Sequence, residues 1–257
     1  MGVVNVTPDS FSDGGLYLDP AAAITHGREL AADGAAILDV GGESTRPGAD
    51  QVAVEEELRR AVPVVAGLAE VGVEISVDTS KAPVAAAALD VGATIVNDVT
   101  ALRGDPEMAG LVAERGAGVV LMHMAGDPRT MQVNPEYGDV VTEVRDFLAA
   151  RLTAAVAAGI DESRIWLDPG IGFGKTAEHN FELLRGLDRL VALGRPILVG
   201  TSRKSFLGRA DGSEPDDRLG GTIATSILAA AAGASVLRVH DVSEMSQALT
   251  MASAVLG

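Results

Sequence analysis

Cysteine is absent from this sequence of 257 residues. That absence excludes a disulfide framework and any zinc or iron–sulfur site with thiolate ligands. No apolar run approaches the roughly 18 residues that a membrane-spanning helix requires. The opening residues, Met1–Asn5, offer neither the basic region nor the long apolar stretch of a signal peptide. We therefore expect a cytoplasmic protein with no membrane partner.

Basic residues are few compared with acidic ones. The chain has 20 Lys and Arg against 36 Asp and Glu, which gives a formal net charge of −16. A protein that binds nucleic acid presents a basic face, and anionic lipid attracts clusters of Lys and Arg. The charge balance therefore argues against binding to nucleic acid and against docking on a membrane surface.

Short apolar runs rich in β-branched residues alternate with Ala- and Glu-rich stretches long enough for helices. Uniformly apolar runs are typical of parallel strands covered on both faces. The stretches at 54–68, 84–89 and 140–158 carry apolar residues at intervals of three and four, as helices do. Strands are predicted about 32 residues apart, which is a βα repeat length. They are Val3–Val6, Ala36–Val40, Glu74–Asp78, Thr94–Asn97, Gly118–Met122, Ile165–Asp168, Ile197–Gly200 and Val236–His240.

Eight βα units in about 250 residues predict a single α/β domain over residues 1–257, a (β/α)8 barrel with its active site at the carboxyl ends of the strands. An open doubly wound sheet is the alternative. That fold should carry a Gly-rich dinucleotide turn after its first strand. The loop in this position, Thr7–Gly15, is polar and lacks the fingerprint, so the barrel is favoured.

Cations follow the last two predicted strands, where barrels often bind phosphate. They are Arg203, Lys204, Arg238 and His240, with Arg46 on the loop after the second strand. In a strongly acidic protein, basic side chains that converge on one rim indicate a local pocket for an anion.

Carboxylate and amide side chains end other strands, namely Asp78, Asn97 and Asp168. An Asp at a strand end more often caps a helix than performs chemistry. Together, the three suit a neutral heterocycle with an amidine edge, because Asp accepts from N–H groups while Asn both donates and accepts. A satisfied polar layer in the barrel mouth is the alternative.

Nucleotide and metal motifs are weak. Residues 169–176 end like a Walker A loop, but Pro169 stands where the first Gly is needed, and Lys175 stands where a dinucleotide motif needs its last Gly. The histidines lack helical metal-ligand spacing. A Mg²⁺ ion held by one or two protein oxygens and substrate phosphates leaves little trace, and Asn5 or an Asp could supply such an oxygen.

Seven segments, in order along the chain, resemble the dihydropteroate synthase family. They are residues 5–15 (NVTPDSFSDGG), 42–48 (GESTRPG), 77–79 (VDT), 97–99 (NDV), 168–175 (DPGIGFGK), 202–205 (SRKS) and 238–241 (RVHD). The likeness covers essentially the whole chain. It implies that 6-hydroxymethyl-7,8-dihydropterin diphosphate is joined to p-aminobenzoate, with release of diphosphate.

Site roles follow from the resemblance, position by position. It implies a pterin pocket of Asp78, Asn97, Met122, Asp168, Lys204 and Arg238. It implies a p-aminobenzoate pocket of Thr45, Pro47, Phe173 and Ser202, and a diphosphate site of Asn5, Thr45, Arg46, Arg238 and His240. Asp13, Arg46 and Lys204 are implied as catalytic, and Asn5 as the ligand of a Mg²⁺ cofactor. The family also implies a homodimer formed through the last helices, over residues 222–232 and 243–255.

The mechanism that the resemblance implies is dissociative. Mg²⁺, Arg238 and His240 would stabilise charge on the departing diphosphate, and Asp168 would stabilise the pterin cation. The neutral aniline nitrogen then attacks, so no strong base is needed. Two rivals remain: a pterin-binding barrel of a corrinoid-dependent methyltransferase, which needs no diphosphate site, and a barrel that binds pterins without turnover.

Overall fold

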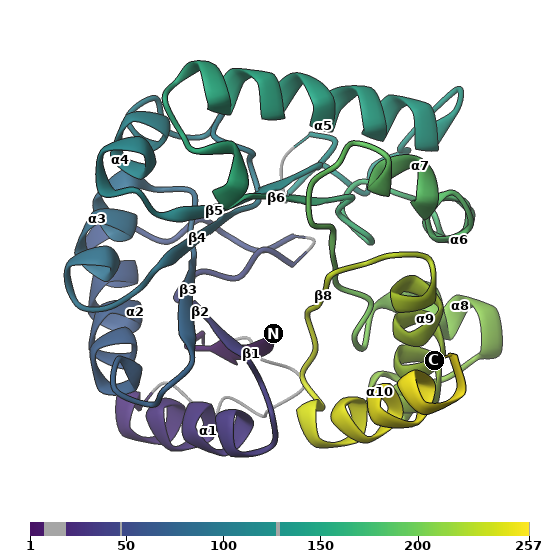
Figure 1. The fold of residues 1–257 in the computed structure, drawn as a ribbon, viewed down its shortest axis with the longest axis horizontal. Helices are drawn as coiled ribbons and strands as arrows, with labels where there is room; N and C mark the ends of the chain where they lie inside the picture. Colours follow the sequence, from purple (N-terminus) through teal and green to yellow (C-terminus); the bar gives the residue numbers. More distant parts are fainter. Residues whose placement is uncertain (8–18, 47, 127–128, 257) are drawn as a thin grey trace.

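The computed structural model describes residues 1–7, 19–46, 48–126 and 129–256. Residue 256 is described by its backbone alone. Parallel strands form a ring, and helices lie outside it (Figure 1). The strands are β1 (Gly2–Asn5), β2 (Ile37–Gly41), β3 (Glu74–Asp78), β4 (Ile95–Asp98), β5 (Gly118–Met122), β6 (Ile165–Asp168), β7 (Leu198–Val199) and β8 (Val236–Leu237).

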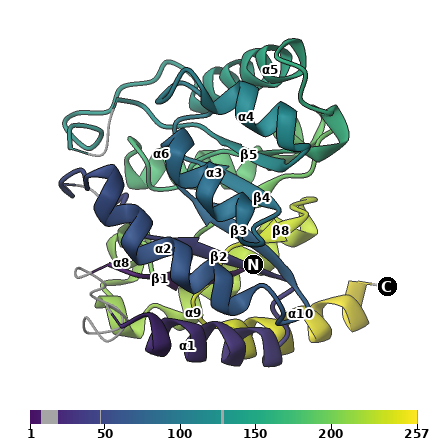
Figure 2. The same cartoon turned by 90° about the vertical axis from the view of Figure 1, so that its left-hand side faces the viewer.

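Helices follow the strands in turn. They are α1 (Pro20–Ala32), α2 (Val54–Leu68), α3 (Ala82–Asp90), α4 (Met108–Arg115), α5 (Val140–Ala157), α6 (Ala177–Arg185), α7 (Leu187–Val191), α8 (Ser205–Asp211), α9 (Leu219–Ala231) and α10 (Val242–Leu256), with short 3-10 turns at Glu162–Arg164 and Pro215–Asp217. In the turned view, α2 and α3 lie in front of the strands, and α1 lies along the lower edge (Figure 2). Within the described residues, no helix is both long and apolar enough to cross a membrane.

The ring closes through two weak seams. Strands β1 to β6 pair in sequence order, whereas β7 and β8 pair only with each other as a separate two-stranded sheet. Single parallel bridges, Leu167 to Ile197 and Gly2 to Val239, join the two sheets. The predicted barrel is confirmed. The last two strands are shorter than predicted because the ladder hydrogen bonds stop at Val199 and Leu237.

Local sequence sets the helix starts. Asp19 accepts a hydrogen bond from the backbone N–H of Ala21, and Pro20 occupies the first turn of α1, where its missing N–H costs nothing. Asp139 caps α5 in the same way through Thr142. Thr176 and His179 form a reciprocal capping box at the start of α6. These caps satisfy N–H groups that the helix itself leaves unpaired.

The alternation of side chains along each strand determines which residues pack against the helices and which face the barrel interior. Successive side chains point to opposite faces, so Val96 faces the helices while Ile95 and Asn97 face the barrel interior. Ile37, Ile95, Val120 and Leu198 form a small apolar cluster of their own, against which Met1 and Trp166 pack. Polar residues of the interior lie nearer the carboxyl ends of the strands, so the rim above this cluster is left for chemistry.

Candidate functional site

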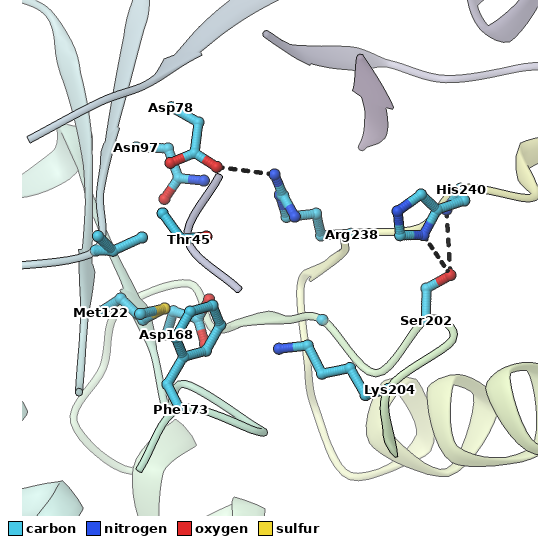
Figure 3. Close-up of a pocket in the computed structure, with 12 residues that line it drawn as sticks. Thr45, Asp78, Asn97, Met122, Asp168, Phe173, Ser202, Lys204, Arg238 and His240 are labelled. Atoms are coloured by element: carbon cyan, nitrogen blue, oxygen red, sulfur yellow. Dashed lines mark hydrogen bonds and ion pairs between the residues drawn. The ribbon is translucent and has the colours of Figure 1, made fainter. Parts of the chain in front are cut away.

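A cavity opens at the carboxyl ends of the strands and gathers most of the predicted site residues (Figure 3). Its lining includes Thr45, Asp78, Asn97, Met122, Asp168, Phe173, Ser202, Lys204, Arg238 and His240. Val99 and Gly200 also line it, and neither was predicted. Gly200 has a readable signal, since it ends the predicted seventh strand; Val99 is an apolar loop residue with none.

Two predicted residues of the described chain, Asn5 and Arg46, are not part of this lining. Asp13 and Pro47 lie outside the described residues. Asn5 ends β1 and is partly exposed. Arg46 is half-buried on the β2–α2 loop, close enough to His240 for its charge to lower the pKa of that imidazole. Asn5 and Arg46 therefore stand beside the cavity rather than in its wall.

Arg238 is the centre of an ion-pair network that the sequence did not reveal. Its Nε donates to Oδ2 of Asp39 at 2.6 Å, and its Nη2 donates to Oδ2 of Asp78 at 3.0 Å. Nδ2 of Asn97 donates to the same Asp39 oxygen at 3.0 Å. The charge of Arg238 is thus compensated by protein carboxylates, and the cationic rim is less positive than the count of basic residues predicts.

Asp78 holds its proton unusually tightly. Burial, and then the negative charge of Asp39, raise its pKa to about 8, although Arg238 acts in the opposite direction. Its Oδ1 atom is buried and has no hydrogen-bond partner among the described residues. An unpaired buried oxygen is costly unless a ligand satisfies it. This oxygen therefore marks a position for a polar ligand atom.

Asp168 faces Asp78 and Asn97 from β6. One carboxylate oxygen accepts from the backbone N–H of Gly170 at 2.6 Å. Burial raises the pKa of Asp168, and the positive charge of Lys204 opposes that change. The carboxylate is fixed by the loop and keeps a second oxygen for a ligand.

Lys204 reaches into the cavity from the start of α8 (Figure 3). Its Nζ donates to the carbonyl of Ile171 and lies 4.4 Å from the centre of the Phe173 ring, a cation–π contact. Burial lowers the pKa of Lys204 to about 8, while the charge of Asp168 supports the ammonium form. The side chain therefore adjoins both the acidic wall and an aromatic face.

His240 and Ser202 form a second polar pair, on the opposite side of Arg238 from Asp78 (Figure 3). Oγ of Ser202 accepts from the backbone N–H of His240 and lies 2.9 Å from its Nδ1. Burial, and then the charge of Arg238, lower the pKa of His240 to about 3. The imidazole is therefore neutral near pH 7.

Arg203 does not belong with the other cations. Its backbone is left-handed, with φ of 58°, and its guanidinium pairs with both oxygens of Asp241, at 2.5 and 3.1 Å. The expectation that this arginine contributes to the anion pocket is wrong. The backbone turn sends Ser202 and Lys204 into the cavity lining and leaves Arg203 out of it.

Two other strand-end acids are structural. Asp98 is fully buried and accepts from Thr100 and from the backbone N–H of Leu102, so it shapes the β4–α4 loop. Glu43 pairs with Lys81, which also contacts the buried Glu57 at 2.5 Å. These contacts fix the base of the β2–α2 loop that carries Thr45.

The glycine-rich segment after β6 is no phosphate loop. The backbone N–H groups of Gly170, Gly172 and Phe173 donate to Asp168, Asn180 and the Gly170 carbonyl. A Walker A loop instead turns its N–H groups toward a phosphate. In this segment the three N–H groups are therefore already paired within the protein.

Oxygen ligands suited to Mg²⁺ lie at the end of β1. Among the described residues, no group of three His, Cys, Asp or Glu could hold a metal ion. A Cβ on Gly41 would lie 3.9 Å from Oδ1 of Asn5 and 3.8 Å from Oδ2 of Asp78. Both oxygens therefore lie on the side of Gly41 where a side chain would stand. Mg²⁺ prefers such ligands and takes the rest from water and phosphate, so the residues fit.

Comparisons with known proteins agree along the whole chain. The family described as "Pterin binding enzyme" matches residues 1–240. Dihydropteroate synthase of Mycobacterium leprae is 53% identical over 264 residues, covering 100% of this chain and 93% of that protein. The Escherichia coli K12 enzyme is 46% identical, covering 100% of this chain and 91% of that protein.

Solved structures give the same result. Dihydropteroate synthase of Xanthomonas albilineans, with 4-aminobenzoic acid, has a TM-score of 0.94 and 51% identity, covering 100% of this chain and 92% of that one. The Yersinia pestis enzyme, in complex with a sulfonamide drug, has a TM-score of 0.96 and 44% identity, covering 99% and 93%. The chain therefore belongs to the pterin-binding enzyme family and, within it, to the dihydropteroate synthases.

Proposed function

We propose that this chain condenses 6-hydroxymethyl-7,8-dihydropterin diphosphate with p-aminobenzoate, using the cavity at the carboxyl ends of its strands. The observation that carries the proposal is the placement of Asp78, Asn97 and Asp168 opposite Lys204 in one cavity. The Xanthomonas albilineans relative has been solved with 4-aminobenzoic acid and with 7,8-dihydropteroate, one substrate and the product of this reaction.

The pterin occupies the acidic side of the cavity. The ring carries adjacent N–H donors and acceptors, which match the carboxylates of Asp78 and Asp168 and the amide of Asn97. The unpartnered Oδ1 of Asp78 gains a hydrogen-bond partner when the ring enters. Met122 packs in an apolar cluster with Val99 and Phe173 and offers a polarizable surface to the face of the ring. Arg238 holds Asp78 in place through its hydrogen bond to Oδ2.

The p-aminobenzoate ring lies farther toward the rim, against Phe173, with Thr45 and Ser202 near its carboxylate. Pro47, assigned to the same pocket, lies outside the described residues. A sulfonamide carries the same aniline ring, so this pocket is also the expected sulfonamide target. Support comes from the Yersinia pestis relative, whose structure contains a sulfonamide drug.

The diphosphate lies beside His240, Arg238, Thr45, Arg46 and Asn5. Ser202 Oγ accepts from the His240 backbone, so its hydroxyl proton is available to Nδ1. That arrangement places the ring proton of a neutral imidazole on Nε2, where it can donate to a phosphate oxygen. Because Arg238 is already paired with Asp39 and Asp78, Arg46 and Lys204 supply further positive charge. Asp13, which the resemblance implies is catalytic, lies outside the described residues.

Asn5 would hold Mg²⁺ through its amide oxygen, with phosphate oxygens and water as the remaining ligands. When bound, the ion neutralises charge on the diphosphate and makes it a better leaving group.

The reaction breaks the bond between the pterin methylene carbon and the diphosphate oxygen, which leaves with the electron pair. The positive charge on the methylene spreads into the pterin ring, and Asp168 stabilises it across the ring N–H groups. The aniline nitrogen forms the new C–N bond and then loses a proton to diphosphate or solvent. No protein base is needed, because a neutral aniline already carries its lone pair.

Release of diphosphate and formation of 7,8-dihydropteroate by the purified chain test the proposal. A corrinoid-dependent methyltransferase would release no diphosphate from these substrates. A barrel that only binds pterins would bind the pterin substrate and fail to restore growth of a folate-auxotrophic strain that lacks its synthase. Either result overturns the proposal.

A homodimer formed through the last helices and a cytoplasmic location complete the proposal. Leu228 on α9 and Met251 and Val255 on α10 are exposed apolar side chains, and these two helices contact each other. Exposed apolar residues on adjacent helices favour an association surface. Cell fractionation tests the location.

A further inference from the structure

The segment between β6 and α6 has an unusual backbone. Gly170, Gly172 and Gly174 have φ values of 65°, 83° and 64°, in the left-handed region. A Cβ at Gly170 would lie 1.9 Å from the carbonyl oxygen of His123, and one at Gly174 would lie 2.7 Å from that of Ala125. The segment therefore packs directly on the chain that leaves β5. Glycine is required at these positions for both the turn and the close approach.

Every carbonyl of residues 170–174 accepts a hydrogen bond from a side chain. Gln132 donates to Gly172 at 2.7 Å, and the hydroxyl of Tyr137 donates to Gly174 at 2.8 Å. Lys204 donates to Ile171. The remaining two carbonyls, those of Gly170 and Phe173, both accept from one side chain, that of Lys175, at 2.9 Å each.

The side chain of Lys175 is buried in the middle of this segment. Its side chain is only 3% exposed. Besides the two carbonyls, its Nζ lies 2.9 Å from Nδ1 of His123 and 3.3 Å from the His123 carbonyl. An ammonium has three N–H donors, and three acceptors at 2.9 Å satisfy them. Lys175 thus ties the end of β5 to the loop that follows β6.

The hydrogen bonds of Lys175 go to carbonyl groups and to one imidazole. Lys175 forms no salt bridge among the described residues. Burial lowers its pKa well below the usual value, whereas the charge of Asp168 acts in the opposite direction. Burying a charge without a salt bridge is costly, so carbonyl dipoles and one imidazole hold it. The side chain does not line the cavity and so does not touch a substrate there.

The loop over residues 170–174, which Lys175 holds, contributes directly to the cavity. Phe173 lines the cavity, and its carbonyl accepts from Lys175. The Ile171 carbonyl holds Lys204, and Gly170 donates to Asp168. Lys175 binds the Phe173 carbonyl directly, whereas Lys204 and Asp168 are held by other groups of the loop. A change at Lys175 therefore acts first on the aromatic wall, without any direct contact with substrate.

We propose that Lys175 is a positioning residue of the synthase reaction, which sets the place of Phe173 and Lys204 by holding the carbonyls of Gly170 and Phe173 against the end of β5. This inference rests on the proposed function. It predicts that the loss of Lys175 acts through Phe173, chiefly on p-aminobenzoate, rather than through general stability.

The test is a double-mutant cycle in the full chain. Lys175→Met keeps the length of the side chain and removes every donor. Val112→Ala, a fully buried residue of α4, is the destabilised control that leaves this loop intact. Each change is made alone and together with Phe173→Ala. Steady-state kinetics give kcat and the KM of each substrate, and thermal unfolding gives the loss of stability.

We expect Lys175→Met to raise the KM for p-aminobenzoate at least ten-fold and to lower kcat, while the KM for the pterin diphosphate rises less. In the Phe173→Ala background the same change should raise the KM for p-aminobenzoate less than three-fold, because the wall it positions is gone. Val112→Ala should leave both KM values unchanged in either background.

Other outcomes separate the two proposals. If the wild-type chain forms no 7,8-dihydropteroate, the proposed function fails. If the wild type is active and Lys175→Met lowers only the unfolding temperature, as Val112→Ala does, or if its effect adds fully to that of Phe173→Ala, the positioning role is wrong. Should Lys175→Met not fold, Lys175→Gln retains two N–H donors and must show the same non-additive effect at smaller size.

Discussion

Arg238 forms an ion pair with Asp39 at 2.6 Å, across 199 positions of sequence. Asp39 is fully buried, and removal of one partner of a buried pair leaves the other charge uncompensated. We expect Asp39→Asn to lower the free energy of unfolding by about 3 kcal/mol, measured by urea denaturation. The exposed pair between Arg145 and Asp146 supplies the control, since Asp146→Asn should change stability by less than about 0.5 kcal/mol. Equal effects of the two changes would contradict a structural role for Asp39.

Lys204→Ala should abolish most of the activity without loss of the fold. Its ammonium adjoins Asp168 and Phe173 in the cavity, and loss of a preorganised charge of this kind costs about 100-fold or more in turnover. Steady-state release of diphosphate measures the effect. Arg209→Ala, an exposed change on the same helix, should stay within about two-fold. Near-wild-type turnover by Lys204→Ala would remove it from the mechanism.

Asp168→Asn should weaken binding of a pterin analogue in calorimetry. A hydrogen bond to a charged group contributes about 1.5–3 kcal/mol, so affinity should fall about 10- to 100-fold. The amide can still accept from the backbone N–H of Gly170, which preserves the loop. Asp161→Asn, at an exposed cap before β6, is the matched control. Unchanged affinity of the Asp168 variant would show that the ring binds elsewhere.

Acid should destabilise the protein through His123. Burial, and then the charge of Lys175, lower the pKa of this imidazole from 6.5 to about 3. A lowered folded-state pKa means that the unfolded chain binds more protons between these values, so stability is present above pH 6.5 and is lost as pH falls. From pH 7 to pH 5, the loss assigned to His123 is about 2 kcal/mol.

His123→Asn isolates that contribution, because the amide oxygen can replace Nδ1 as an acceptor but does not titrate. Urea denaturation at pH 7 and at pH 5 should show a smaller drop for the variant than for the wild type, by about the same 2 kcal/mol. His240 is retained in both proteins, so its own titration cancels. Parallel pH profiles would mean that His123 already titrates normally in the folded state.

The dimer proposal predicts that charge on α9 and α10 yields a monomer. Leu228 and Met251 are 68% and 65% exposed, and a carboxylate at either position opposes burial in an interface. We expect the double variant Leu228→Glu/Met251→Glu to sediment as a monomer and the wild type as a dimer. Val133→Glu, equally exposed at 77% in the β5–α5 connection, should leave the dimer intact. A monomeric wild type would end this proposal.

The barrel and most of its cavity follow from sequence for one physical reason. Parallel strands with βα connections must converge at their carboxyl ends, so Asp78, Asn97 and Asp168 meet although they are far apart in the chain. The alternation of side chains along a strand then determines whether each residue points into the barrel or toward the helices. That rule correctly separates Asn97 from its neighbour Asp98, which is turned away to hold a loop.

Pairings across the barrel were not predictable. Which cation pairs with which carboxylate depends on how far each side chain reaches across the barrel. No local sequence pattern encodes the contact of Arg238 with Asp39. Arg203 and Lys204 are adjacent in sequence, yet a left-handed backbone at Arg203 sends the two side chains in different directions. Lys175 was visible only as the end of a glycine-rich motif; its burial arises from tertiary packing of one loop on another.

The division of the strands between two sheets has a consequence for how the cleft can adjust. Asp78, Asn97 and Asp168 belong to the six-stranded sheet, whereas Ser202, Lys204, Arg238 and His240 follow the two-stranded one. The two walls of the cavity therefore belong to different sheets, which are joined by one backbone bridge on each side. A small shift of the β7–β8 sheet relative to the six-stranded sheet would change the width of the cavity and leave the pairing within each sheet intact. The contacts of Arg238 with Asp39 and Asp78 would limit such a shift, because they connect the two sheets.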